Sequence, residues 1–183
     1  MAITVVPYSD EWPVCFDQLA GTLRAALRSV PDAVVEHVGS TSVPGLPAKP
    51  VLDVDVIVSG AEVSAAVAAL QAIGYVHRGD LGVVGREAFR APDEDPARHV
   101  YVCTRGTLNV RNHLAVREVL RRRADLREEY GAVKLALAAD PRMDVPAYLA
   151  GKTAVLQKVL AAAGSAFTED ELAQIRRLND PES

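Results

Sequence analysis

The segment VLDVDVIV, residues 51–58, constrains the fold of this chain more than any other stretch. Five of its eight residues are valine or isoleucine, which favour strands. Alternate residues of a strand point to the same face, so Asp53 and Asp55 share one face and the apolar residues between them share the other. We therefore expect a strand that packs against helices on one face and carries two adjacent carboxylates on the other.

These two carboxylates make Asp53 and Asp55 a candidate metal site. Parallel carboxylates repel, and each favours its protonated form unless a cation lies between them. A solvated sheet face would explain one such aspartate more readily than two. Hard oxygen ligands suit Mg²⁺ or Mn²⁺, and Mg²⁺ also takes substrate phosphates as ligands.

The loop GSTSVPG, residues 39–45, precedes this strand. Gly39 permits a close backbone approach, and the Ser and Thr residues that follow offer hydroxyl and N–H donors that can hold phosphate oxygens. No Walker motif is present, and an ordinary turn would explain the loop if it stood alone. The order of a strand over 34–38, this loop and an Asp-x-Asp strand is, however, typical of nucleotidyltransferase folds.

The remaining apolar spacing predicts further helices and strands. The expected helices are one from a cap at Ser9 to Pro31, one over 61–73, one over 112–139, one over 147–163, and a last one opened by a capping box of Thr168 and Glu171. The expected additional strands cover 75–84 and 98–104. This order predicts an α+β fold in one domain over 1–183, with a small mixed sheet over about 33–110 and a helical cap over about 112–178.

Composition excludes several classes of protein. The chain is 49% hydrophobic and 24% charged, which is typical of a globular domain. A net charge of −4 and an aromatic content of 5% argue against nucleic acid as a partner. The two cysteines form no CxxC motif, and neither a signal peptide nor a membrane span is visible, so we expect a cytoplasmic protein without a membrane partner.

Residues 35–58, VEHVGSTSVPGLPAKPVLDVDVIV, closely resemble the core motif of the GrpB-like (glutamate-rich protein B) family, which is related to the nucleotidyltransferase superfamily. Further matches follow in order along the chain: VVPYSDEW (5–12), RHVYV (98–102), VREVLR (116–121), the pair Tyr130 and Lys134, and YLAGK (148–152). The resemblance covers residue 3 to about 160. It implies a polymerase-β-like sheet with flanking helices.

Through the superfamily, the resemblance also implies metal-dependent nucleotidyl transfer from ATP or another NTP to a small-molecule acceptor. Asp53 and Asp55 would then hold the metal, and His99 would be a third ligand or a proton acceptor. Active superfamily members usually add a third carboxylate from a later strand, but the strand over 98–104 offers no acid on the face of His99. An ATP-dependent carboxylate–amine ligase acting through an acyl-adenylate, and a non-catalytic nucleotide- or anion-binding module, therefore remain alternatives.

The expected substrate-binding residues are His37, Gly39, Ser40, Thr41, Lys49, Arg117, Lys134, Tyr148 and Lys152. A structural bond between His37 and the turn is slightly favoured over a bond to phosphate. Lys49 is as compatible with pairing to an aspartate as with reaching a phosphate. Arg117 and Lys152 are expected to close the cleft of Asp53 as an anion clamp, with Lys134 helping to orient the triphosphate or an anionic acceptor.

Overall fold

A five-stranded mixed sheet forms the centre of the structure, a computed structural model that describes residues 3–178. Its strand order is β1-β2-β5-β4-β3, in which β2 and β5 run parallel and the other neighbours antiparallel. The strands are β1 (Val34–Val38), β2 (Leu52–Val58), β3 (Val76–His77), β4 (Arg86–Arg90) and β5 (Arg98–Thr104). The expected α+β class is confirmed.

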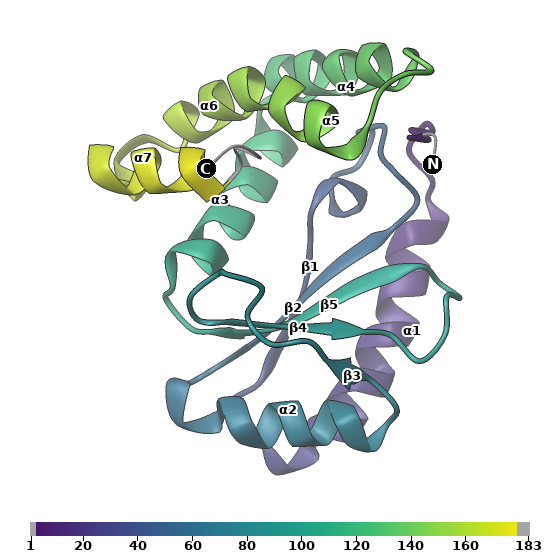
Figure 1. The fold of residues 1–183 in the computed structure, drawn as a ribbon, viewed down its shortest axis with the longest axis vertical. Helices are drawn as coiled ribbons and strands as arrows, with labels where there is room; N and C mark the ends of the chain where they lie inside the picture. Colours follow the sequence, from purple (N-terminus) through teal and green to yellow (C-terminus); the bar gives the residue numbers. More distant parts are fainter. Residues whose placement is uncertain (1–2, 179–183) are drawn as a thin grey trace.

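Helices cover both faces of this sheet (Figure 1). They are α1 (Glu11–Ala26), α2 (Val63–Ala72), α3 (Leu108–Arg122), α4 (Ala124–Ala138), α5 (Val145–Gly151), α6 (Thr153–Ala162) and α7 (Glu169–Leu178). Helices α1 and α2 pack on one face, α3 crosses the other, and α4 to α7 form a cap beyond α3 (Figure 1). No helix within residues 3–178 is both long and apolar enough to cross a membrane.

The apolar face of β2 lies in the main core, as its alternation predicts. Val54 and Val56 are fully buried and belong to the same apolar cluster as Leu23 of α1 and Leu70 of α2. A second apolar cluster joins the loop after β1 to α3, α4 and α6, and it contains Leu46. The cap is therefore held against the loop that precedes β2.

The starts of the first and last helices involve the predicted side chains, although α1 ends at Ala26, before the expected Pro31. The N-cap of α1 is Asp10, and Ser9 contributes by accepting a hydrogen bond from the Glu11 amide through Oγ at 3.2 Å. The capping box before α7 is confirmed, because the Glu171 amide donates to Thr168 Oγ1 at 3.2 Å and the Thr168 amide donates to Glu171 Oε2 at 2.9 Å.

Two predicted helices are each divided in two. The helix expected over 112–139 begins earlier, at Leu108, and breaks at Arg123, whose backbone is extended (φ −107°, ψ 93°). The break lets α4 turn back and share an apolar cluster with α3 and α6. The helix expected over 147–163 divides at Lys152 between α5 and α6.

The strand expected over 75–84 was wrong in extent. Only β3, at Val76–His77, forms there, and β4 lies beyond the predicted range. Between them Gly79, Gly82 and Gly85 adopt positive φ angles of 74°, 78° and 75°, which turn the chain and end the strand. The sequence of β4, REAFR, carries charges at three of its five positions and therefore lacks an apolar pattern.

Candidate functional site

Asp53 and Asp55 lie on the face of β2 that is directed away from the main core. The residues between and beside them, Leu52, Val54 and Val56, all belong to that core. In the parallel pairing of β2 with β5, Asp53 is opposite His99 and Asp55 is opposite Tyr101. The prediction that the two carboxylates share a face is confirmed.

Each carboxylate is hydrogen-bonded to its own imidazole. Asp53 Oδ1 lies 3.0 Å from Nδ1 of His99, and Asp55 Oδ2 lies 2.8 Å from Nδ1 of His113 on α3. The hydrogen bond to Asp53 raises the pKa of His99, against the opposing effect of burial. Burial would lower the pKa of His113, but the hydrogen bond and charge of Asp55 outweigh it and the pKa is raised.

His113 is a site residue that the sequence analysis did not identify. Its signal is positional, because Val110, His113 and Arg117 recur at helical spacing along one side of α3. Val110 is buried beside β2 and β5, so this side of the helix faces the sheet. A histidine on this side of α3 therefore contacts the polar face of β2.

The two aspartates differ in their access to solvent. The Asp53 side chain is 35% exposed, whereas Asp55 is fully buried. The expectation that both open into one cleft therefore needs correction, because only Asp53 lines the pocket described below. Asp55 Oδ1 is buried and has no hydrogen-bond partner in the described part of the chain. A cation between the two carboxylates would supply that missing partner.

Gly39, in the loop after β1, lies so close to Asp53 that a side chain at this position would collide with the carboxylate. Gly39 has φ +69°, and a Cβ built on it would lie 2.2 Å from Asp53 Oδ2. Ser42 fixes the turn, because its Oγ donates to the Gly39 carbonyl at 2.6 Å. The close backbone approach expected at Gly39 is therefore made to the Asp53 carboxylate, and the expected contact of Gly39 with a substrate phosphate stays a prediction.

A pocket of about 130 Å³ adjoins Asp53, and three lysines line it. We call it the lysine pocket; its lining residues are Ser40, Lys49, Val51, Asp53, His99, Lys134, Tyr148 and Lys152. Lys49 Nζ and Lys152 Nζ each lie 4.6 Å from the centroid of the Tyr148 ring. Lys49 forms no ion pair with a described aspartate, so of its two expected positions it occupies the one that faces the pocket.

Lys134 is the most unusual member of this pocket. It is only 2% exposed, its Nζ has no hydrogen-bond partner among the described residues, and that atom lies 4.6 Å from the Tyr130 ring centroid. Burial, together with the charge of Lys152, lowers the pKa of Lys134 to about 7. Burial and the charge of Lys49 likewise lower the pKa of Lys152 to about 8. An anion bound among these lysines would stabilise their protonated, positively charged forms.

His37 and Thr41 brace the loop and do not line the pocket. His37 Nε2 lies 3.0 Å from Thr41 Oγ1, and the Thr41 hydroxyl donates to the Val51 carbonyl at 3.4 Å. The imidazole also stacks on Phe16 with 4.6 Å between centroids, and burial lowers the pKa of His37 to about 4. The structural interpretation of His37 is therefore correct, and the expected contact of His37 and Thr41 with substrate is replaced by support of the loop.

Arg117 also lies outside the lysine pocket. Its guanidinium donates to Glu36 Oε2 at 2.7 Å and to the His37 carbonyl at 2.8 Å, which ties α3 to β1. The neighbouring Arg121 donates to the Ser42 carbonyl at 2.8 Å. The expected clamp of Arg117 and Lys152 is thus wrong for Arg117, because its Nε and Nη1 groups are bonded within the fold and the side chain does not line the pocket.

Replacing Arg117 by alanine should therefore lower stability and leave ligand affinity unchanged. Loss of bonds to a carboxylate and a carbonyl should reduce the free energy of unfolding by about 1–3 kcal/mol, which urea denaturation would measure. Arg122→Ala is the matched control, since the Arg122 side chain is 76% exposed. A loss of ATP affinity in Arg117→Ala without a loss of stability would contradict this assignment.

The sheet order, the Gly-Ser loop and the paired aspartates define a polymerase-β-like nucleotidyltransferase fold. The chain superposes on a structure of the GLD-2/RNP-8 complex with a TM-score of 0.57 at 16% identity, covering 83% of this chain and 60% of that one. A structure of the Cid1 poly(U) polymerase gives a TM-score of 0.50 at 15% identity, covering 83% of this chain and 49% of that one.

Within this class the chain belongs to the GrpB family, whose model, described as GrpB protein, matches residues 2–162. The crystal structure of the conserved protein GrpB from Enterococcus faecalis is 32% identical, with a TM-score of 0.76 over 87% of this chain and 96% of that one. The UPF0157 protein BH1888 of Halalkalibacterium halodurans is 34% identical over 90% of this chain and 84% of its own length. The UPF0157 protein YqkA of Bacillus subtilis is 30% identical over 82% of this chain, which spans only 44% of that relative.

Proposed function

We propose that this protein transfers a nucleotidyl group from ATP or another NTP to a small-molecule acceptor. The observation that carries the proposal is the position of Asp53, which lies beside Asp55 on β2 and also lines a pocket with three lysines. Carboxylates that can hold a divalent cation and lysines that can hold phosphates are the two groups that this chemistry requires. The nucleotidyltransferase fold supports the proposal at the level of class.

Asp53 and Asp55 would hold Mg²⁺ or Mn²⁺. The donor set fits a hard cation, and the buried Asp55 Oδ1 lacks any other partner among the described residues. Within residues 3–178 no group of three or more His, Cys, Asp or Glu side chains is arranged around a common metal position, so nucleotide phosphates would have to complete the ligand set. A bound cation would offset the negative charge of the phosphates and align them for displacement.

Lys49, Lys134 and Lys152 would bind the terminal phosphates. Three ammonium groups around a pocket of about 130 Å³ suit a compact, highly charged anion. Ser40, at the start of the loop, adds a hydroxyl donor on the same wall. Tyr148 keeps the Lys49 and Lys152 ammonium groups near its ring, which orders two long side chains before the nucleotide arrives.

The proposed reaction is an in-line displacement at the α-phosphorus. A hydroxyl or amine of the acceptor forms a bond to phosphorus, the bond to the pyrophosphate oxygen breaks, and pyrophosphate leaves. The proton of the nucleophile passes to His99, whose side chain is 60% exposed and whose Nδ1 is engaged by Asp53, leaving Nε2 for the acceptor. A carboxylate acceptor would instead yield an acyl-adenylate for an amine to attack, which is the ligase variant of the same first step.

A non-catalytic nucleotide-binding module is the second candidate. The observation that favours it is the lack of an acid on the matching face of β5, where the residues are His99, Tyr101 and Cys103. Such a module would bind nucleotide through the same lysines without turnover.

Pyrophosphate release separates these two functions. The protein would be incubated with each NTP, MgCl₂ and a pool of small metabolites, and nucleotide binding would be measured in parallel by calorimetry. Release that depends on both Mg²⁺ and the metabolite pool supports the transferase. Binding without release for any nucleotide supports the module, and the absence of both would reject the site.

ATP affinity should fall by about tenfold or more as the pH rises from 7.5 to 9. Protonated lysines bind the phosphates, and Lys134 and Lys152, with pKa values of about 7 and about 8, lose their protons in or below this range. Because the phosphates bind to protonated lysines, these lysines must take up protons when ATP binds. The free energy needed for this uptake increases with pH, so the affinity for ATP falls. The second pKa of a phosphate monoester is about 6, so the ligand itself changes little in this range.

Calorimetry in at least two buffers would measure this dependence and the uptake of protons. Lys134→Met should bind more weakly at pH 7.5 and lose part of the pH dependence, whereas Lys158→Met, at an exposed ion pair with Glu129, should match the wild type. Affinity that is constant or rises with pH would argue against the lysines as phosphate ligands.

A further inference from the structure

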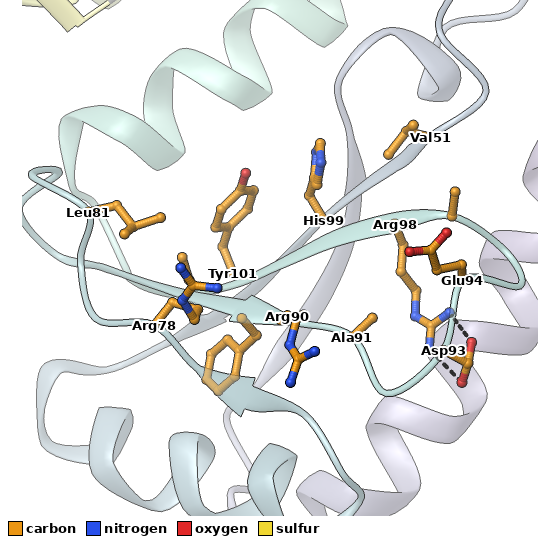
Figure 2. Close-up of a pocket in the computed structure, with 13 residues that line it drawn as sticks. Val51, Arg78, Leu81, Arg90, Ala91, Asp93, Glu94, Arg98, His99 and Tyr101 are labelled. Carbon is orange, nitrogen blue, oxygen red and sulfur yellow. Dashed lines mark hydrogen bonds and ion pairs between the residues drawn. The ribbon is translucent and has the colours of Figure 1, made fainter. Parts of the chain in front are cut away.

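A second, larger cavity adjoins the lysine pocket. It has a volume of about 800 Å³, lies along β4 and β5, and is called here the β4–β5 cavity (Figure 2). Val51 and His99 line both this cavity and the lysine pocket, so the two meet at the pair of His99 and Asp53. Figure 2 shows His99 and Tyr101 rising from β5 on the same side. A molecule in this cavity could therefore reach the proposed site of chemistry without occupying the lysine pocket.

The wall next to the site is partly apolar. Tyr101 lies opposite Asp55 in the sheet register, and the Arg86 guanidinium lies 4.8 Å from the centroid of its ring. Ala88, opposite Tyr101 on β4, and Leu81 extend the apolar surface along the cavity. This surface suits the carbon skeleton of a small molecule.

The charged side chains of the cavity are only partly neutralised. Arg98 donates to Asp93 Oδ1 at 2.7 Å and to the Tyr75 hydroxyl at 2.8 Å, so its donors are already used. Arg78 and Arg90 also line the cavity, and neither side chain forms a hydrogen bond or ion pair with any residue in the described range 3–178. Three arginines against Asp93 and Glu94 leave one net positive charge.

We propose that the β4–β5 cavity binds the acceptor, and that the acceptor carries a carboxylate or a phosphate recognised by Arg78 and Arg90. Its hydroxyl or amine would reach His99 at the junction with the lysine pocket. Guanidinium groups bind such planar or tetrahedral oxyanions through paired N–H donors. An uncharged nucleoside would offer the two arginines only neutral acceptors, which form weaker hydrogen bonds with a guanidinium than an oxyanion does. The inference rests on the proposed function only in calling the ligand an acceptor.

Nuclear magnetic resonance of the ¹⁵N-labelled protein tests the binding directly. Succinate, inorganic phosphate and the neutral analogue succinamide would each be titrated at constant ionic strength, while the Nε–H signals of the arginines and the amide signals of Ala88 and Tyr101 are followed. We expect saturable shifts with succinate or phosphate and none with succinamide; the two anions tell a carboxylate acceptor from a phosphorylated one. Arg78→Gln and Arg90→Gln should each weaken binding at least fivefold, whereas Arg122→Gln should not.

The same sample with saturating ATP and MgCl₂ keeps this inference separate from the proposed function. Anion binding that persists with ATP present supports two adjacent sites. Displacement of the anion by ATP, unsaturable shifts, or equal effects in Arg78→Gln and Arg122→Gln would overturn the acceptor site. A protein that fails to bind ATP but still binds succinate at Arg78 would refute the nucleotidyltransferase proposal while leaving the anion site intact.

Discussion

Asp53→Asn should eliminate the Mg²⁺-dependent part of ATP binding and reduce pyrophosphate release by about a hundredfold to a thousandfold or more. Asparagine keeps the shape of the side chain but removes the negative charge and the hard oxygen ligand that a divalent cation needs. Stability should change little, because the Asp53–His99 pair is partly exposed and such pairs contribute about 0–1 kcal/mol. Calorimetry with and without MgCl₂, together with a pyrophosphate assay, would measure the effect.

The matched control for this change is Asp125→Asn. Asp125 is exposed and paired with Arg123 at the start of α4, so its loss alters net charge by the same amount away from the pocket. ATP binding should be unchanged in this control. If Asp53→Asn binds ATP with wild-type affinity and the same response to Mg²⁺, Asp53 is not a metal ligand.

Gly39→Ala should abolish nucleotide binding and also destabilise the fold. The new Cβ would lie 2.2 Å from Asp53 Oδ2 and 2.9 Å from Asp53 Cβ, so either the loop or β2 must move. The backbone of Gly39 (φ 69°, ψ −173°) lies in a region essentially restricted to glycine, so any residue with a Cβ adds a strain of about 1–3 kcal/mol. Urea denaturation would give the stability, and calorimetry would give the loss of affinity.

Gly79→Ala separates backbone strain from the collision with Asp53. Gly79 has a similar φ of +74°, but nothing lies within 4 Å of a Cβ built there. This variant should lose about 1–2 kcal/mol of stability and keep its affinity for ATP. Equal losses of affinity in the two variants would mean that the approach of Gly39 to Asp53 has no role in binding.

The central strand and its polar face could be predicted because alternation is a local property. Val54 and Val56 are buried on one face and Asp53 lies on the other, as a period of two requires. The capping box of Thr168 and Glu171 was predictable for the same reason, since its hydrogen bonds join residues three apart. Local signals of this kind need no knowledge of the tertiary packing.

The features that were missed depend on packing between distant segments. Lys134 was expected to bind substrate, but nothing local indicates that a lysine is buried, because burial follows from α4 turning back at Arg123. No glycine or proline marks that turn. His113 was missed because its partner Asp55 is 58 residues away, and a histidine within an otherwise polar helix looks exposed. The donors of Arg117 were assigned to a ligand because its true partner, Glu36, is equally remote.

The lysine pocket is built from two separate parts of the chain, one in the sheet region and one in the helical cap, and this affects how the protein can diverge. Ser40 and Lys49 come from the segment between β1 and β2 and Asp53 comes from β2, whereas Lys134, Tyr148 and Lys152 come from α4, α5 and the turn after α5. A gene fragment that ends after β5 would encode the acids without two of the three lysines. Recombination between β5 and α3 would replace the two lysines of the helical cap while keeping the aspartates. The helical cap is therefore the part through which a descendant could acquire a different anion preference without a change in its carboxylates.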